Sequence, residues 1–578
     1  MTSDRMTRGD AIFVAVCVAV TVAGGAIGIA GFSRAFPEAS IDFKVTREQA
    51  VGVARKELAA RGFDVSGMKP LVLFDHDDEA KVYLERTLGL AKANPLFGKE
   101  VPLWRWTVRF VKPLQTLEYI VYVDPSGRPT AFRRILPEKE AAPDAGEAGA
   151  RALAERALKE TFGVDVGAVA AVPAATAATA VTAVAAVPAV PAVTAATPPA
   201  PSGSAAQAVS APARFVEGTT EKRPARLDRT FTWESTTLRH GDGALRWTVE
   251  VQGDRVGRAK SFYKVPEKWT EEYGILRGKN IAANGVATVG LLVTLLAMMA
   301  TFVARVRRGD VKWKWAIAFG GVGAVLQLAS SLNELPVTLF SYDTADAWGS
   351  VVAKAVLGGF GGAVLLGMVL VLMVAGGEPL YREAYPGKPA LGRIFSRRGM
   401  GSRPFFRGLL LGYALTGFFF AYQVIFYVAA EKAGAWAPAD VPYSNLLGTS
   451  FPWLAVLLMG FMPSTTEEFL SRMFSIPFFR RYLPLAAAVV VPAFLWGFAH
   501  AAYPNQPFWI RGVEVGVAGC LIGAVMLKAD LFPLLVWHFT VDAVYTSLIL
   551  VRSTNTYFVV SGALAAGCLL YTSPSPRD

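Results

Sequence analysis

The sequence predicts a mainly α-helical membrane protein: a polytopic transmembrane helix bundle with an α+β extracytoplasmic region between its first and second transmembrane helices. Three observations support this fold class. Hydrophobic residues make up 53% of the 578 residues, more than in an ordinary soluble protein. Runs of roughly 20 apolar residues, long enough to cross the hydrocarbon core of a bilayer, recur along the chain. One long hydrophilic stretch, residues 34–280, separates the first run from all the others.

The apolar runs define the candidate membrane spans. The first, at about 11–33, is expected to be an uncleaved anchor, because it is long for a signal peptide and lacks a clear cleavage site. The later candidates lie at about 281–304, 314–332, 350–376, 408–430, 452–479, 483–502, 509–527 and 531–551, with an incomplete one after 556.

These spans divide the chain into six parts. They are the anchor (1–33), a first extracytoplasmic α+β repeat (34–145), a second repeat with a low-complexity insertion at 171–213 (146–280), transmembrane helices with basic loops (281–405), a helix bundle with the candidate catalytic residues (406–567) and a tail (568–578). The tail, CLLYTSPSPRD, matches a translated sequencing adapter and is interpreted as read-through, outside the fold.

Charge and cysteine content exclude two classes of function. The formal net charge is +12, which in a soluble protein would suggest nucleic acid. In a membrane protein the same excess is typical of basic cytoplasmic loops, so we expect no nucleic-acid partner. The three cysteines, Cys17, Cys520 and Cys568, lie in apolar segments without paired spacing, which argues against a disulfide framework and a thiolate zinc site.

The distribution of basic residues predicts the orientation. Residues 305–314, 378–407 and 480–481 are rich in Lys and Arg, whereas 333–348 has none and holds three acids. Cytoplasmic loops carry the excess of Lys and Arg. We therefore expect a protein of the bacterial inner membrane with a cytoplasmic N-terminus and with 34–280 on the outer side.

The outer region contains a weak internal duplication. RWTV recurs at Arg105 and Arg246, and PEK at Pro137 and Pro266. Each copy reads as a helix followed by a β-meander, and the first helix opens with a capping box at Thr46. The copies resemble the PepSY-type module. Ala, Val, Thr and Pro dominate the insertion, a composition that favours a mobile linker over a membrane helix.

Two adjacent glutamates interrupt the apolar run 452–479. Pro463 followed by Ser-Thr-Thr-Glu reads as a helix start, so we expect the apolar run to be kinked or to restart there. Glu468 and Arg472 are four residues apart on one helix face, in the favourable order for an ion pair. Glu467 points about 100° away and has no partner within this helix. One glutamate is thus expected to be structural and the other available for chemistry.

Two of the four histidines lie in apolar segments. His76 and His240 are in hydrophilic turns and are interpreted as surface residues, whereas His500 and His538 lie late and early in membrane spans. Ionisable groups in such segments are costly and usually functional. Asp542 follows His538 by one helical turn, so the pair can share a metal, or the carboxylate can orient the imidazole.

The order of these motifs resembles the CPBP family, which comprises CAAX proteases and bacteriocin-processing enzymes and is also called ABI or type II CAAX prenyl endopeptidase-like. The motifs read EEFLSR (467–472), WGFAH (496–500) and HFTVD (538–542). Trp496 stands where the family usually has Phe. The resemblance covers about 406–555 and does not extend to the outer repeats.

The resemblance implies an intramembrane metalloprotease. Glu467 would be the general base for an attacking water. His500, His538 and Asp542 would hold zinc or, without metal, position the water and stabilise the oxyanion. The substrate would be a membrane protein or a lipid-anchored peptide within the lipid bilayer. Two other functions remain open: a catalytically silent relative acting as scaffold or immunity factor, and an ion-coupled transporter, for which we find no inverted repeats.

Depth counting conflicts with a shared site. If 483–502 and 531–551 both cross the membrane as straight helices, His500 and His538 are more than about 10 Å apart along the membrane normal. Convergence therefore requires that a span is wrongly placed, or that helices tilt strongly or break. Prolines 463, 492 and 533 are the expected places for such breaks.

Overall fold

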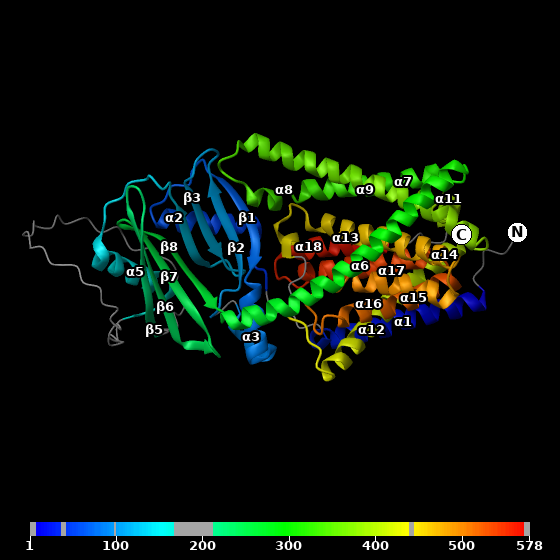
Figure 1. Ribbon diagram of the computed structural model, residues 1–578, viewed down its shortest axis with the longest axis horizontal. Helices are drawn as coiled ribbons and strands as arrows, with labels where there is room; N and C mark the ends of the chain where they lie inside the picture. The colour runs from blue at the N-terminus through cyan, green and yellow to red at the C-terminus, as the bar shows by residue number, and fades with distance from the viewer. Residues whose placement is uncertain (1–6, 36–41, 98–99, 167–211, 439–443, 572–578) are drawn as a thin grey trace, which may run out of the picture.

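The computed structural model describes an elongated molecule with a sheet-rich half and a helical half (Figure 1). The described residues are 7–35, 42–97, 100–166, 212–438 and 444–571. The predicted insertion 171–213 lies almost entirely outside them, as do the last seven residues of the predicted read-through tail.

One eight-stranded antiparallel sheet forms the core of the outer region. The strands are β1 (Lys69–His76), β2 (Trp104–Val111), β3 (Glu118–Val123), β4 (Pro129–Ile135), β5 (Ala213–Lys222), β6 (Leu227–His240), β7 (Gly243–Gln252) and β8 (Arg255–Lys264). Their order is β1-β2-β3-β4-β8-β7-β6-β5. Each duplicated segment thus contributes a four-stranded meander, and the two meanders join through their last strands, where Phe132 pairs with Ala259.

Helices α2 (Arg47–Ala60) and α5 (Gly146–Phe162) cover one face of this sheet. The alternation in β2 explains the packing, because Trp104, Trp106, Val108 and Phe110 are all buried on that face. The predicted capping box at the start of α2 is confirmed, with the Thr46 side chain accepting from the Gln49 N–H and the Gln49 side chain from the Thr46 N–H.

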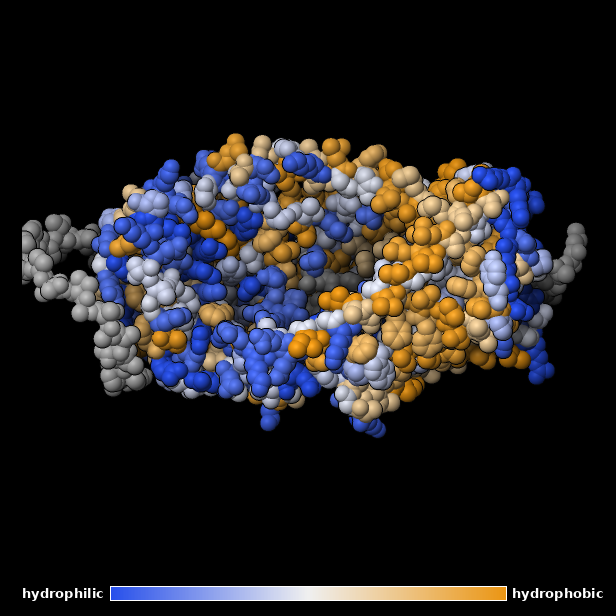
Figure 2. All heavy atoms as spheres, viewed as in Figure 1, coloured by the Kyte–Doolittle hydropathy of each residue, from blue (hydrophilic) through white to orange (hydrophobic). Residues whose placement is uncertain are grey.

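The helical half confirms the polytopic membrane fold. Among the described residues, seven helices are long and apolar enough to cross a membrane. They are α1 (Arg8–Ala35), α6 (Glu267–Arg307), α7 (Trp313–Asn333), α9 (Trp348–Ala384), α12 (Arg403–Lys432), α16 (Ile510–Lys528) and α17 (Phe532–Val551). The sheet region lies in the chain between the first and second of these spans. Hydrophobic residues cover most of the visible face of this half, as Figure 2 shows.

Shorter elements complete the fold. In the outer region these are α3 (Asp78–Leu88), α4 (Leu90–Ala93) and η1 (Asn94–Leu96). In the helical half they are α8 (Leu335–Thr338), η2 (Leu339–Ser341), α10 (Leu391–Ile394), α11 (Arg397–Met400), η3 (Ser444–Gly448), α13 (Pro452–Glu468), the π-helical turn η4 (Phe469–Phe474), α14 (Ser475–Phe479), α15 (Leu485–Phe498) and α18 (Thr556–Tyr571). Helix α6 follows β8 after two residues, so it connects the sheet directly to the bundle.

Candidate active site

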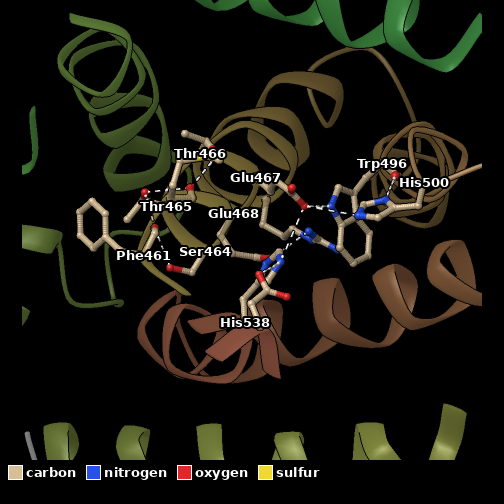
Figure 3. Close-up of polar contacts among 12 residues, drawn as sticks. Phe461, Ser464, Thr465, Thr466, Glu467, Glu468, Trp496, His500 and His538 are labelled. Carbon is tan, nitrogen blue, oxygen red and sulfur yellow. Dashed lines mark hydrogen bonds and ion pairs between the residues drawn. The ribbon is translucent and has the colours of Figure 1, made fainter. Parts of the chain in front are cut away.

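Three segments of the bundle bring the four candidate residues together. Glu467 lies in the last turn of α13, His500 just beyond the end of α15, and His538 and Asp542 in α17. The Glu467 Oε2 atom is 3.7 Å from His538 Nε2 and 4.0 Å from His500 Nε2. Asp542 Oδ2 is 3.5 Å from His538 Nε2. Figure 3 shows the Glu467 carboxylate directed toward Trp496 and His500.

The predicted helix start at Pro463 is wrong. Helix α13 continues through Pro463 to Glu468. The hydroxyls expected to cap a new helix instead bond back to carbonyls one turn earlier: those of Ser464 and Thr465 to Phe461 O and that of Thr466 to Met462 O. Such bonds satisfy Ser and Thr inside an apolar helix.

The helix changes its winding immediately after the two glutamates. Residues Phe469–Phe474 form the π-helical turn η4, and α14 follows it without a gap. A π-turn holds an additional residue compared with an α-turn, and such turns are frequent at functional sites. The predicted span 452–479 is therefore three consecutive helical elements, and the irregular one begins directly beside the catalytic candidate.

Glu468 forms the predicted ion pair and a second contact that the sequence did not reveal. Arg472 Nη1 donates to Glu468 Oε1 over 2.9 Å. The same Glu468 Oε1 atom is 2.8 Å from His538 Nδ1. Because a carboxylate oxygen accepts, His538 Nδ1 is the donor of this hydrogen bond. Bonding of Nδ1 leaves His538 Nε2 directed toward Glu467 and Asp542. Glu468 thus orients one histidine of the site, in the manner of a carboxylate–histidine pair.

His500 is oriented by the backbone. Its Nδ1 lies 2.9 Å from Trp496 O. A carbonyl only accepts, so this nitrogen donates, and Nε2 is the atom that faces Glu467. Both histidines therefore present Nε2 to the same carboxylate oxygen.

A short helix resolves the conflict over depth. Helix α15 has 14 residues, about 21 Å of rise, which is less than the roughly 30 Å hydrocarbon core. The predicted span 483–502 is thus too long, since the helix ends at Phe498 and His500 lies in the turn that follows. His500 consequently does not have to lie on the far side of the bilayer from His538.

Helix α6 supplies the hydrogen bonds that this irregular turn requires. Asn280 Nδ2 donates to the carbonyls of Ala501, Tyr503 and Asn505. Asn284 Nδ2 lies within hydrogen-bond distance of Ala499 O. Non-helical backbone within a membrane protein needs such internal partners.

Trp496 also belongs to the site, although in the sequence it stood out only as a departure from the family motif. Its indole Nε1 donates to Glu467 Oε2. The Arg472 guanidinium lies 3.9 Å from the centre of its ring. The Trp496 side chain thus connects the buried ion pair to the candidate base. Its position one turn before His500 is the signal that could have indicated this.

The supporting residues of the site are more deeply buried than most of the candidate catalytic residues. The side chains of Glu468 and Arg472 are 0% and 1% exposed, and that of His538 is 7% exposed. Those of Glu467, His500 and Asp542 are 30%, 23% and 23% exposed. The arrangement can therefore present a carboxylate and two imidazoles to a water molecule while the supporting charges remain buried.

The donor types of the site match zinc. Two imidazoles and a carboxylate are ligands that zinc takes in hydrolases. Within the part of the chain that the structure describes, no group of three or more His, Cys, Asp or Glu side chains is placed to hold a metal ion. The zinc expectation for His500, His538 and Asp542 stays a prediction.

Comparison with known proteins supports the assignment of this region. Residues 449–544 match the family described as Type II CAAX prenyl endopeptidase Rce1-like. The sporulation-killing factor biosynthesis protein SkfC of Bacillus subtilis (strain 168) is 22% identical over 306 residues, which cover 52% of this chain and 58% of that protein. The chain thus spans less than two thirds of this relative's length. No solved structure matches. The segment that contains Glu467, His500, His538 and Asp542 is therefore a domain of the Rce1-like CAAX prenyl endopeptidase family.

Proposed function

We propose that this protein is an intramembrane endopeptidase that hydrolyses a peptide bond with a water molecule activated by Glu467. The single observation that carries the proposal is the convergence of two histidine Nε2 atoms on one Glu467 oxygen, within 4.0 Å. The family match supports the peptidase class. The site lies in the helical half, so the substrate class is a membrane protein or a lipid-anchored peptide.

The proposed reaction begins with a water bound between the carboxylate and the imidazoles. Glu467 accepts a proton from this water as its oxygen attacks the carbonyl carbon of the scissile bond. A neutral imidazole accepts a hydrogen bond from the water through Nε2, which fixes the direction of attack. The proton held by Glu467 then passes to the leaving amine nitrogen, and the carbon–nitrogen bond breaks.

The buried residues have positioning roles in this proposal. Glu468 holds His538 through Nδ1 and is itself compensated by Arg472. Trp496 donates to the base and fixes the direction of its carboxylate. Asp542 lies beside His538 Nε2, where it can orient the water or bind the substrate backbone. None of these roles requires a metal, and metal analysis of the purified protein measures whether zinc is bound.

The proposed function is tested with Glu467→Gln and a matched control, Glu272→Gln, which makes the same change at an exposed position of α6. Each purified protein is reconstituted into liposomes together with membrane proteins extracted from a bacterial host. New peptide N-termini are identified by mass spectrometry. General-base catalysis contributes typically 10²–10⁴-fold, so we expect Glu467→Gln to lower cleavage by at least about 100-fold at unchanged thermal stability.

The Glu272→Gln control shows whether an effect is specific to Glu467. Glu272→Gln should produce the same new N-termini as the wild-type protein. Cleavage by Glu467→Gln at the wild-type rate would refute the proposed role of this residue. Absence of any new N-termini with wild-type protein would favour a catalytically silent scaffold or immunity factor instead.

A further inference from the structure

The sheet has one face that its helices leave uncovered. Helices α2 and α5 pack on the tryptophan-rich face. At one end of the opposite face, Arg109 donates to Phe340 O and Tyr342 O, in the segment between α7 and α9. The uncovered face is therefore turned toward the membrane-embedded half. Figure 2 shows a recess between the hydrophilic and hydrophobic halves of the molecule.

Four cations gather on the central strands of this face. They are Arg105 in β2, Arg133 in β4, and Arg258 and Lys260 in β8. Their neighbours in sequence point into the core, because residues alternate between the two faces of a sheet. Arg133 lies directly opposite Arg258 at the junction of the two meanders. Like charges directly opposite each other destabilise a sheet.

Acidic residues compensate only part of this charge, and Glu250 in β7 lies directly opposite Arg258. Arg105 pairs with Asp75 over 3.0 Å. Arg133, Arg258 and Lys260 make no ion pair or side-chain hydrogen bond to any residue in the described ranges. All three side chains are only partly exposed, so water screens them incompletely.

The electrostatic cost is visible at Lys260. Burial, followed by the charges of Arg258, Arg105 and Arg133, lowers the pKa of its ammonium group to about 8, against a small opposing effect of Asp77. An anionic ligand would relieve this repulsion and stabilise the protonated lysine. A cluster of this kind on an otherwise well-paired sheet therefore points to a bound anion.

We propose that this face binds an acidic segment of the substrate polypeptide outside the membrane. The inference rests on the proposed peptidase function. It adds to that function a recognition surface outside the membrane, composed of Arg105, Arg133, Arg258 and Lys260. This surface would hold a substrate that is cleaved in the bundle.

The position of the cluster favours a peptide over a lipid headgroup. Helix α6 begins at Glu267 and reaches Asn280, at the start of its apolar stretch, after 13 residues, about 20 Å of rise. The headgroup layer adds only several ångströms to each side of the hydrocarbon core. The cluster precedes α6 in β8, and the same helix holds the turn that carries His500. A polypeptide held at the sheet can extend along this path to the bundle.

The test is direct binding by the full-length Glu467→Gln protein, so that cleavage does not remove the probe. The probe is a fluorescently labelled glutamate-rich peptide, compared with a glutamine-rich peptide of the same length, and binding is measured by anisotropy in zwitterionic nanodiscs. Arg258→Gln/Lys260→Gln is compared with Arg156→Gln/Lys222→Gln, which removes the same charge from exposed positions in α5 and β5. We expect about tenfold weaker binding for the first pair at low salt and no change for the control pair.

A pH series adds a readout that general charge loss cannot imitate. Binding should weaken as pH rises through about 8, since Lys260 then loses its proton while Arg258, Arg105 and Arg133 remain charged. Lys260→Arg keeps its charge and should bind with a flat profile over the same range.

The outcomes are distinguishable from failure of the peptidase proposal. Equal affinity of the two peptides, or equal loss with both double variants, would overturn the recognition surface whatever the cleavage assay shows. Cluster-dependent binding of anionic phosphatidylglycerol vesicles without binding of the peptide would also overturn it, because the face would then belong to lipid. Peptide binding that depends on the cluster upholds it even if Glu467 proves not to be the base.

Discussion

At the scale of single residues, two neighbouring glutamates are placed in opposite environments by one helix. Glu468 is completely buried between Arg472 and His538, whereas Glu467 is partly exposed and faces two imidazoles. Consecutive residues on a helix point about 100° apart. One side chain can therefore be buried inside the bundle while the next is partly exposed. Two adjacent glutamates can thus have different roles.

Substitution of Glu468 tests its structural role. In Glu468→Gln, the Arg472 charge is left buried without its ion-pair partner, which typically costs about 3–5 kcal/mol. We therefore expect a large loss of stability, measured as the thermal unfolding midpoint in detergent, with Glu272→Gln unchanged. The double variant Glu468→Gln/Arg472→Met should recover much of that loss, since the stranded charge is gone. Wild-type stability of Glu468→Gln would mean that the ion pair contributes nothing.

Substitution of Trp496 separates the aromatic ring from its N–H group. Trp496→Phe keeps a ring beside Arg472 but removes the donor to Glu467. A hydrogen bond to a charged group contributes about 1.5 kcal/mol or more, so cleavage should fall about tenfold without a large change in stability. Initial rates of cleavage and unfolding midpoints, compared with wild type, measure the two effects. Complete inactivity of a stable Trp496→Phe protein would show that the indole N–H is indispensable.

At the scale of secondary-structure elements, the sequence predicted contacts within one helix and missed those between helices. The Glu468–Arg472 pair follows from their spacing alone. The bonds of His538 to Glu468 and of Trp496 to Glu467 join residues that are far apart in the chain, so no local pattern reveals them.

Two predicted boundaries were wrong for physical reasons. Pro463 did not restart a helix, because the hydroxyls that follow it bond within the same helix. The span at 483–502 was predicted from hydropathy alone. Hydropathy does not reveal that the residues after Phe498 leave the helix and that their backbone accepts hydrogen bonds from α6. In both places, side-chain donors form hydrogen bonds to backbone carbonyls.

The support of this turn by α6 is open to test. In Asn280→Ala, the carbonyls of Ala501, Tyr503 and Asn505 lose their shared donor, at a cost of about 2 kcal/mol. We expect faster amide hydrogen exchange in residues 499–505 and lower cleavage, because His500 lies in this turn. Thr288→Ala is the control, since its hydroxyl donates to Asn284 O within α6. Unchanged exchange in Asn280→Ala would contradict the proposed support.

At the scale of the whole molecule, composition and repeats predicted most of the architecture. Hydropathy indicated a helical bundle, and the repeated RWTV strands indicated duplicated meanders. The sequence did not indicate that both copies join into one continuous sheet through β4 and β8, because a pairing between two edge strands leaves no periodic pattern. That junction brings Arg133 opposite Arg258 and creates the cationic face.

The orientation of the molecule in the membrane is the remaining prediction. Arg403 and Arg407 of the basic segment 378–407 pair with Asp10, near the start of α1. The N-terminal end of α1 and this basic segment therefore lie at the same end of the bundle, and the excess of Lys and Arg predicts that this end is cytoplasmic. The sheet would then lie outside the cytoplasmic membrane, where it can meet the extracytoplasmic part of a substrate.

Cysteine labelling measures the orientation directly. The three native cysteines are first replaced by alanine, and Thr220→Cys in β5 or Met400→Cys in α11 is then introduced, both at exposed positions. A membrane-impermeant maleimide applied to intact spheroplasts should label Thr220→Cys, while Met400→Cys should react only after the membrane is permeabilised. Both variants should be labelled equally in detergent, which controls for reactivity. Labelling of Met400→Cys in intact spheroplasts would reverse the topology and place the cationic face in the cytoplasm, where an acidic segment would have to be cytoplasmic to reach it.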